Sequence, residues 1–90
     1  MRTEQADTRA ITITMLAEIC ETEPRAIEGD QRLREDLGMD SLQSLELLSC
    51  VSEALKIDLD IAEAMAICTV DDACAFVLRQ YQEQRTHGRS

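Results

Sequence analysis

The chain has 90 residues, of which 44% are hydrophobic and only 2% aromatic, and its formal net charge at pH 7 is −9. This length supports one domain, and the mixture of residues favours helices over an all-β sandwich. The acidic balance argues against nucleic acid and anionic membranes as partners, because both require a basic protein surface. No segment resembles a signal peptide or a transmembrane helix, so we expect a soluble, cytoplasmic protein. We also expect a monomer.

The first helix is expected over residues 5–20. Its centre, AITITM, alternates in the manner of a strand, but strong helix formers flank it and no partner strand follows. Two apolar stripes fit the helical period, one through Ile13, Leu16, Ala17 and Cys20 and the other through Ile11, Met15 and Ile19.

A long connection follows over residues 21–39. Pro24 disfavours continuation of the first helix past Glu23. Three apolar side chains are expected to anchor the connection to the core, namely Ile27, Leu33 and Leu37. A loop of this length in a small domain is usually functional or well packed. Gly38 offers a backbone position with positive φ just before the next helix.

The second helix has the clearest signal. Asp40 and Gln43 have the spacing of a capping box with Asp40 as the N-cap, which puts Ser41 at the first helical position. The residues that follow the spacing of a buried stripe are Leu42, Leu45, Leu48, Val51, Ser52 and Leu55.

Two further helices are predicted. Ile57 and Leu59 are expected to point inward, and IAEAMAI is long enough for a short third helix. Thr69 and Asp72 form another capping signal for the last helix, which we expect to fray near residues 80–84. Its inward residues are Val70, Ala73, Cys74, Val77 and Leu78. The predicted fold is all-α, a bundle of three longer helices and one short helix, with residues 1–84 as the domain and 85–90 as a flexible polar tail.

Catalytic and metal sites are not expected. Ser41 has no adjacent base, because the one histidine is His87 in the predicted tail and the pattern G-x-S-x-G is absent. DLDIAEAMAICT lacks the glycine and glutamate of a calcium loop. No C-x-x-C pair occurs, and the cysteines are interpreted as reduced core residues: Cys20, Cys50, Cys68 and Cys74.

Ser41 can instead be modified by another enzyme. A serine in the first turn of a helix presents its hydroxyl outward, and a phosphodiester there lies near free backbone N–H groups and the positive end of the helix dipole. The plain alternative is an ordinary helix-start serine, because serine is common in such turns. Local reasoning leaves both interpretations open.

Matches elsewhere in the chain favour modification. LREDLGMDSLQSLEL resembles the attachment motif D-L-G-x-D-S-L of acyl carrier proteins. LKIDLDI resembles the segment after the second helix of that family, and AICTVDDACAFV resembles the stretch I-x-T-V-x-D-A that opens the last helix. The resemblance covers roughly residues 10–80. The short D-S-L motif is weakly specific, whereas the ordered set of matches is strongly specific.

The resemblance implies a non-catalytic carrier. A phosphopantetheinyl transferase would attach 4′-phosphopantetheine from coenzyme A to Ser41, flanked by Gly38, Asp40 and Leu42, and the thiol of this arm would hold acyl groups as thioesters. Further partners would be a ketosynthase, an acyltransferase or an acyl ligase. The candidates for an acyl crevice are Leu45, Leu48, Val51, Ile61, Met65 and Ile67, although most of them also suit a plain core role.

Acidic residues surround the attachment motif. Residues 30–72 contain eleven acidic and three basic side chains, so most of the net negative charge lies there. The resemblance assigns to partner recognition the residues Asp36, Asp40, Glu46 and Glu53. The composition alone equally fits a solvated surface.

The sequence departs from the family in two places. Fatty-acid carriers often have acids or methionine where this chain has Gln43, Ser44, Ser49 and Ser52, which suggests a dedicated partner set in polyketide or other specialised biosynthesis. Peptidyl carriers usually have a second glycine where Met39 stands, which disfavours an aminoacyl cargo. The alternatives are an aminoacyl or peptidyl carrier and an unmodified helical adaptor. An initial Met1 and polar ends favour a free-standing protein.

Overall fold

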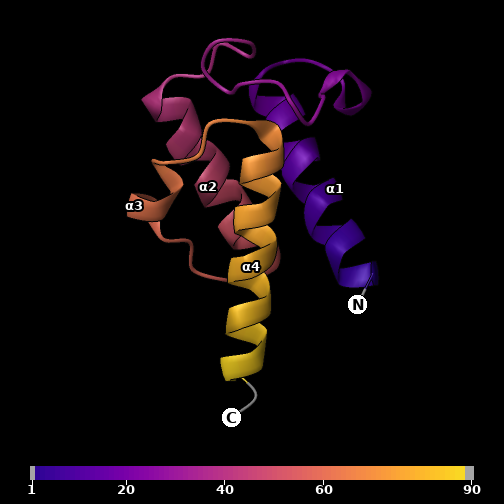
Figure 1. Cartoon of the computed structure of the whole chain (residues 1–90), viewed down its shortest axis with the longest axis vertical. Coiled ribbons are helices and arrows are strands. Elements are labelled where there is room, and N and C mark those ends of the chain that lie inside the picture. Colours follow the sequence, from indigo (N-terminus) through magenta and orange to yellow (C-terminus); the bar gives the residue numbers. More distant parts are fainter. Residues whose placement is uncertain (1, 89–90) are drawn as a thin grey trace.

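Three helices pack together and a fourth, short helix lies beside them (Figure 1). The structure, a computed structural model, describes the backbone of residues 2–88 and the side chains of residues 7–84. Its helices are α1 (Arg2–Ile19), the 3₁₀ turn η1 (Pro24–Ala26), α2 (Ser41–Leu55), α3 (Ile61–Ala64) and α4 (Val70–Gly88). No sheet occurs in residues 2–88, so the predicted all-α fold with three longer helices and one short one is confirmed. None of the described helices is long and apolar enough to cross a membrane.

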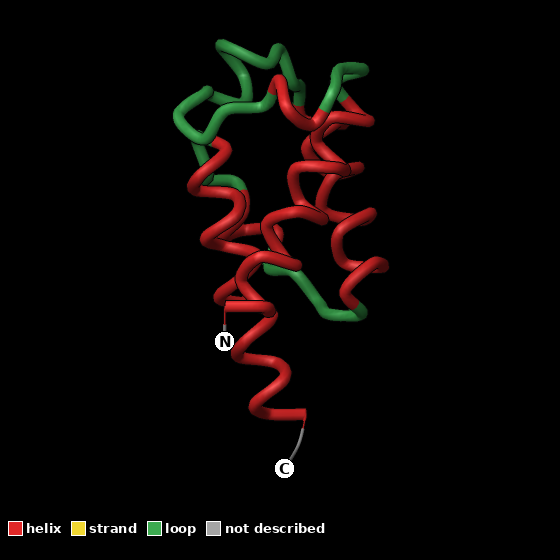
Figure 2. The backbone as a smooth tube through the Cα atoms, turned by 90° about the vertical axis from the view of Figure 1, so that its right-hand side faces the viewer, coloured by secondary structure: helices red, strands yellow, loops and turns green. Residues whose placement is uncertain are grey.

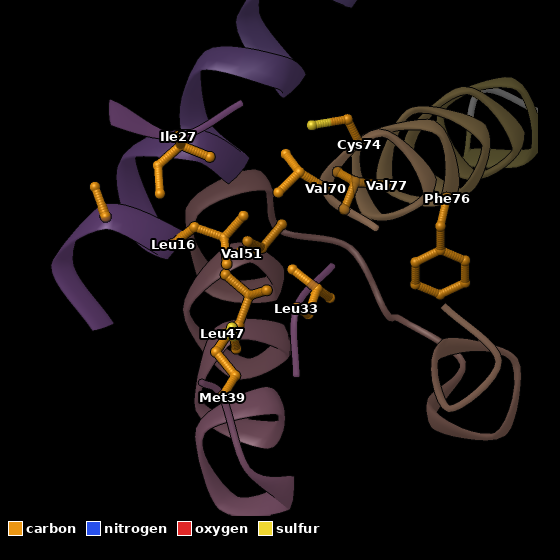
Figure 3. Packing of buried hydrophobic residues seen from close by; sticks show 11 residues of the cluster. Leu16, Ile27, Leu33, Met39, Leu47, Val51, Val70, Cys74, Phe76 and Val77 are labelled. Atoms are coloured by element: carbon orange, nitrogen blue, oxygen red, sulfur yellow. The ribbon is translucent and has the colours of Figure 1, made fainter. Parts of the chain in front are cut away.

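The core lies where α1 meets both α2 and α4 (Figure 3). Leu16 of α1, Val51 of α2 and Val70 of α4 are each fully buried. Phe76 is also buried, although the sequence reading did not place it inward. Burying an aliphatic side chain completely stabilises a fold by about 1.5–3 kcal/mol, so this three-helix contact holds the domain together.

Helix α1 buries a partly polar stripe. Leu16 and Ala17 from the first of the two predicted stripes are buried, but the stripe continues through Thr8 and Thr12 rather than through further aliphatic residues. The Thr12 hydroxyl donates a hydrogen bond of 2.8 Å to the carbonyl of Thr8 one turn earlier. Because this bond satisfies the hydroxyl inside the helix, threonine can be buried there at little cost.

Helix α2 buries only the second part of the predicted stripe, in which Val51 is buried and Leu48 and Leu55 pack against the core. Leu47, which the predicted stripe omits, is buried together with Val51, whereas Leu42 and Leu45 are 66% and 43% exposed. A helix turns about 100° per residue, so Leu42 lies about 140° around the axis from Leu47. The spacing rule accepted either set of leucines, and the contacts with α1 select the set that contains Leu47.

The loop between α1 and α2 crosses one end of the bundle, where Figure 2 shows it as an extended loop. Ile27 and Leu33 are buried and Leu37 is half-buried, which confirms all three predicted anchors. Backbone hydrogen bonds tie this loop to the start of α4, from Leu33 N–H to the Cys68 carbonyl and from Val70 N–H to the Gln31 carbonyl. The loop is therefore well packed at its second half.

The last helix begins as predicted and ends later. Thr69 and Asp72 exchange two hydrogen bonds, in which the Thr69 hydroxyl accepts from Asp72 N–H at 3.1 Å and the Asp72 carboxylate accepts from Thr69 N–H at 3.3 Å. The helix does not fray near residues 80–84 but continues to Gly88, into the segment predicted as a tail. Glu63 of α3 forms an ion pair with Arg79 of α4 at 3.0 Å, which fixes α3 to this helix.

The cysteines do not all lie in the core. Cys74 is buried and Cys20 is half-buried, as predicted, but Cys50 and Cys68 are exposed, which corrects the sequence-based interpretation. All four thiols are free. Burial raises the pKa of the thiols of Cys74 and Cys20 above the ordinary range, because a thiolate is poorly solvated there. Burial therefore favours the protonated form of both thiols at neutral pH.

Candidate functional site

Ser41 stands at the start of α2 without serving as its cap. The Asp40 carboxylate accepts the N–H of Gln43 at 2.8 Å, and the Gln43 side chain accepts the N–H of Asp40 at 3.2 Å. This is the predicted capping box, with Asp40 as N-cap. Ser41 is exposed and occupies the first helical position. Its hydroxyl is thus free of the capping role and faces solvent.

The turn before α2 places Ser41 at the start of the helix. Gly38 has a φ of 72°, as the sequence predicts, and a Cβ atom added to it would meet nothing within 4 Å. The glycine is therefore needed for its backbone conformation and not for space. Met39 N–H donates to the Leu33 carbonyl at 2.9 Å, and the Met39 side chain is buried in the core. The residues on the N-terminal side of Ser41 are therefore held firmly.

One basic side chain lies beside Ser41. Arg34 Nη2 is 3.4 Å from Ser41 Oγ, a long hydrogen bond between two exposed groups. Sequence reasoning did not single out Arg34, because the two residues are seven positions apart in a loop whose course the sequence does not fix.

A cavity of about 370 Å³ opens beside Ser41, and Ser41 and Arg34 are among its lining residues. Its walls come from α2, the segment around α3 and α4, with Thr12 of α1 and residues 33–35 of the loop. Five of the six crevice candidates line it, namely Leu45, Leu48, Val51, Met65 and Ile67. The sixth, Ile61, does not line it and is 53% exposed. Phe76 and Val77 of α4 also line the cavity, and no sequence signal separates such residues from ordinary core.

The four acidic candidates for partner recognition are all exposed: Asp36, Asp40, Glu46 and Glu53. Asp36 and Asp40 also have local duties, because Asp36 accepts the Arg32 N–H at 2.7 Å and Asp40 caps α2. Glu46 and Glu53 are two helical turns apart and so share one face of α2. That face also carries the exposed Leu42.

No metal-binding cluster of histidine, cysteine, aspartate and glutamate occurs among the described side chains. The one histidine in the sequence, His87, belongs to the last turns of α4. Figure 1 shows that end of α4 at the opposite end of the molecule from the start of α2. The geometry around Ser41 is that of an exposed hydroxyl beside a mainly apolar cavity, an arrangement that suits a carrier module.

Comparison with known proteins agrees with this class. Residues 12–77 match the family model described as the phosphopantetheine attachment site. An acyl carrier protein of Sulfurovum sp. (strain NBC37-1) is 39% identical over 54 residues, which cover 60% of this chain and 72% of the relative. An acyl carrier protein of Prochlorococcus marinus (strain MIT 9515) is 33% identical over 64 residues, which cover 71% of this chain and 80% of the relative.

A solved structure supports the same assignment. A chain assigned as an acyl carrier protein from Mycobacterium tuberculosis superposes with a TM-score of 0.72 at 28% identity, covering 78% of this chain and 93% of that one. The chain therefore belongs to the acyl carrier protein family, whose members carry phosphopantetheine and are not themselves catalytic.

Proposed function

We propose that Ser41 is the residue to which 4′-phosphopantetheine is attached from coenzyme A by a phosphopantetheinyl transferase. The observation that carries this proposal is the exposed hydroxyl of Ser41 beside a cavity, at the first position of α2. Asp40, and not Ser41, caps this helix. The residues fit the group, because the first turn of α2 offers backbone N–H groups and a positive dipole end to a phosphodiester. Ser41 needs no base from this chain, since the transferase supplies the activation.

The cavity is proposed to shelter the cargo. The arm, once attached, supplies a terminal thiol that holds an acyl group as a thioester. The residues of this chain then bind the acyl chain and exclude water from it, chiefly Leu45, Leu48, Val51, Met65 and Ile67. A volume of about 370 Å³ lies within the range of about 300–1,000 Å³ that small ligands occupy in proteins. Ile61 does not line this cavity, so no role in sheltering the cargo is proposed for it.

Docking of partner enzymes is proposed on the exposed face of α2. Glu46 and Glu53 present negative charge there, and no ion pair engages either of them among the described side chains. Such a face favours a ketosynthase, an acyltransferase or an acyl ligase with a basic patch, because complementary charge speeds encounter. Asp36 and Asp40 would add to this field near Ser41.

The pathway is proposed to be polyketide, fatty-acid or related biosynthesis in the cytoplasm. Gln43, Ser44 and Ser49 make α2 less acidic than in typical fatty-acid carriers, which supports a dedicated partner set in polyketide or other specialised biosynthesis. The structure shows Ser49 exposed on α2, so its identity bears on which enzymes bind there.

The proposal is tested by incubating the protein with coenzyme A and a broad-specificity transferase and then measuring the intact mass. We expect a gain of one phosphopantetheinyl group in the wild type and in Ser49→Ala, an exposed serine on the same helix, and no gain in Ser41→Ala. An unmodified wild type would favour the adaptor interpretation and contradict the proposal. A holo protein charged only by aminoacyl-activating enzymes would point to the peptidyl alternative.

A further inference from the structure

Arg34 is held in place by the loop that precedes α2. Its carbonyl accepts the N–H of Gly38 at 3.1 Å, and the neighbouring Leu33 is buried and hydrogen-bonded to Cys68. The backbone of Arg34 is thus anchored on both sides, in a turn that folds back towards α2. This anchoring brings the guanidinium to 3.4 Å from Ser41 Oγ.

The charges around Arg34 leave it without a carboxylate partner. Arg32, two residues earlier, forms an ion pair with Asp36 at 3.8 Å. Arg34 forms none with the side chains of residues 7–84, and within that range its guanidinium contacts only the neutral hydroxyl of Ser41. A cation is therefore placed against the atom that would become a phosphodiester oxygen.

We propose that Arg34 binds the phosphate of the arm, an inference that rests on the proposed attachment at Ser41. A phosphodiester carries one negative charge at neutral pH, and the guanidinium offers several N–H donors in a fork that matches phosphate oxygens. The new negative charge would lie close in sequence to Glu35, Asp36 and Asp40, all of which repel it. Arg34 offsets this repulsion and adds to the favourable dipole of α2.

The contact between Arg34 and the phosphate would also fix the position of the first part of the arm. Arg34 and Ser41 both line the cavity that holds Leu45 and Met65. A phosphate bound by Arg34 is held at this cavity instead of swinging freely in solvent. Arg34 is thus a positioning residue for the root of the arm.

The test is a thermodynamic cycle with two changes, the loading of the arm and the substitution of Arg34. Apo and fully loaded forms are purified for the wild type, Arg34→Gln, Arg34→Lys and Arg32→Gln, and the Tm of each is measured at low salt. Since only purified loaded protein is compared, the rate of loading does not enter. Arg32→Gln is the matched control, because Arg32 is engaged with Asp36 and not with Ser41.

We expect loading to raise the Tm of the wild type by about 1–6 °C more than it raises the Tm of Arg34→Gln. This is the change in Tm that one exposed ion pair produces in a domain of this length. This difference in Tm between the wild type and Arg34→Gln should be smaller in 1 M salt, because the Debye length is then only about 3 Å. Arg34→Lys should keep part of the increment, because it retains the charge without the fork. Arg32→Gln should keep all of it.

A second readout is the ³¹P resonance of the arm. Its position should differ between loaded wild type and loaded Arg34→Gln, and it should respond to salt only in the wild type. Equal increments in Tm and equal ³¹P spectra for the wild type and Arg34→Gln would overturn the role of Arg34 and leave the attachment at Ser41 intact. A mass gain that persists in Ser41→Ala would overturn the attachment site itself, and the inference with it.

Discussion

The two sides of α2 make different use of the same residue type. Towards α1 and α4, Leu47 and Val51 are buried in a close-packed core. Towards α3, Leu45 stays partly exposed, α3 contains no buried residue, and a cavity opens. Leu42 is exposed on the face of α2 that carries Glu46 and Glu53. Apolar residues in a sequence therefore do not all report on stability. In this chain Leu47 and Val51 hold the fold and also form part of the cavity wall, whereas Leu42 and Leu45 are available to partners and cargo.

The largest expected effect separates these two sets. Leu16→Ala should lower the free energy of unfolding by about 3 kcal/mol, because it removes a fully buried side chain and leaves a hole in the core. Leu42→Ala should change it by less than about 0.5 kcal/mol, because that leucine is mostly exposed. Urea unfolding of the apo protein measures both. Similar losses for the two variants would show that the exposed leucines belong to the core.

Cargo should stabilise the open side. Loading a short acyl group on the arm should raise the free energy of unfolding by about 2 kcal/mol over the holo form, because two or three buried CH₂ groups contribute about 0.8 kcal/mol each. Ser44→Phe should abolish the gain by filling the cavity that Ser44 lines. Ser49→Phe, on the exposed face, is the matched control and should keep the gain. Equal gains in both variants would place the cargo elsewhere.

The capping box should separate Asp40 from Ser41. Asp40→Ala should cost about 1 kcal/mol of apo stability, because it removes the acceptor for the Gln43 N–H. Ser41→Ala should cost less than about 0.5 kcal/mol, because its hydroxyl caps nothing. Thermal unfolding of the apo forms measures both, and a Ser41→Ala loss as large as that of Asp40→Ala would return the capping role to Ser41.

The smallest effect concerns the thiols. Cys50 and Cys68 should be alkylated faster than Cys74 and Cys20 in the native protein, and all four equally in urea. Burial raises the pKa of Cys74 in the folded protein above the ordinary cysteine value of about 8.5. The free energy of unfolding should therefore be unaffected by this thiol at neutral pH and should fall as the pH rises above about 8.5. Mass spectrometry after timed iodoacetamide labelling reads the order, and a fast Cys74 would contradict the packing of α4.

Local signals predicted the helix starts well, and longer-range packing limited the rest. Asp40 with Gln43 and Thr69 with Asp72 act within one turn, so their spacing alone specifies the caps. The buried face of α2 depends on its packing against α1, and the spacing of the leucines alone fits two different buried faces. The burial of Thr12 needs a hydrogen bond within α1 that hydropathy does not report.

The candidate site shows the same division. The motif around Ser41 is contiguous, and the family resemblance pointed to it directly. The cavity brings together side chains from five segments, namely α1, the loop before α2, α2, the segment around α3 and α4, and five of the six candidates meet there. The contact between Arg34 and Ser41 depends on the course of the loop, which only the structure supplies.

The central claim is that the arm is attached to Ser41, and fragmentation of one peptide tests it directly. Trypsin cleavage after Arg34 and Lys56 releases residues 35–56, a peptide that contains the serines Ser41, Ser44, Ser49 and Ser52. Tandem mass spectrometry of the loaded protein should assign the phosphopantetheinyl group to Ser41 alone. Assignment to any of the other three serines, or an unmodified peptide from loaded protein, would contradict the account.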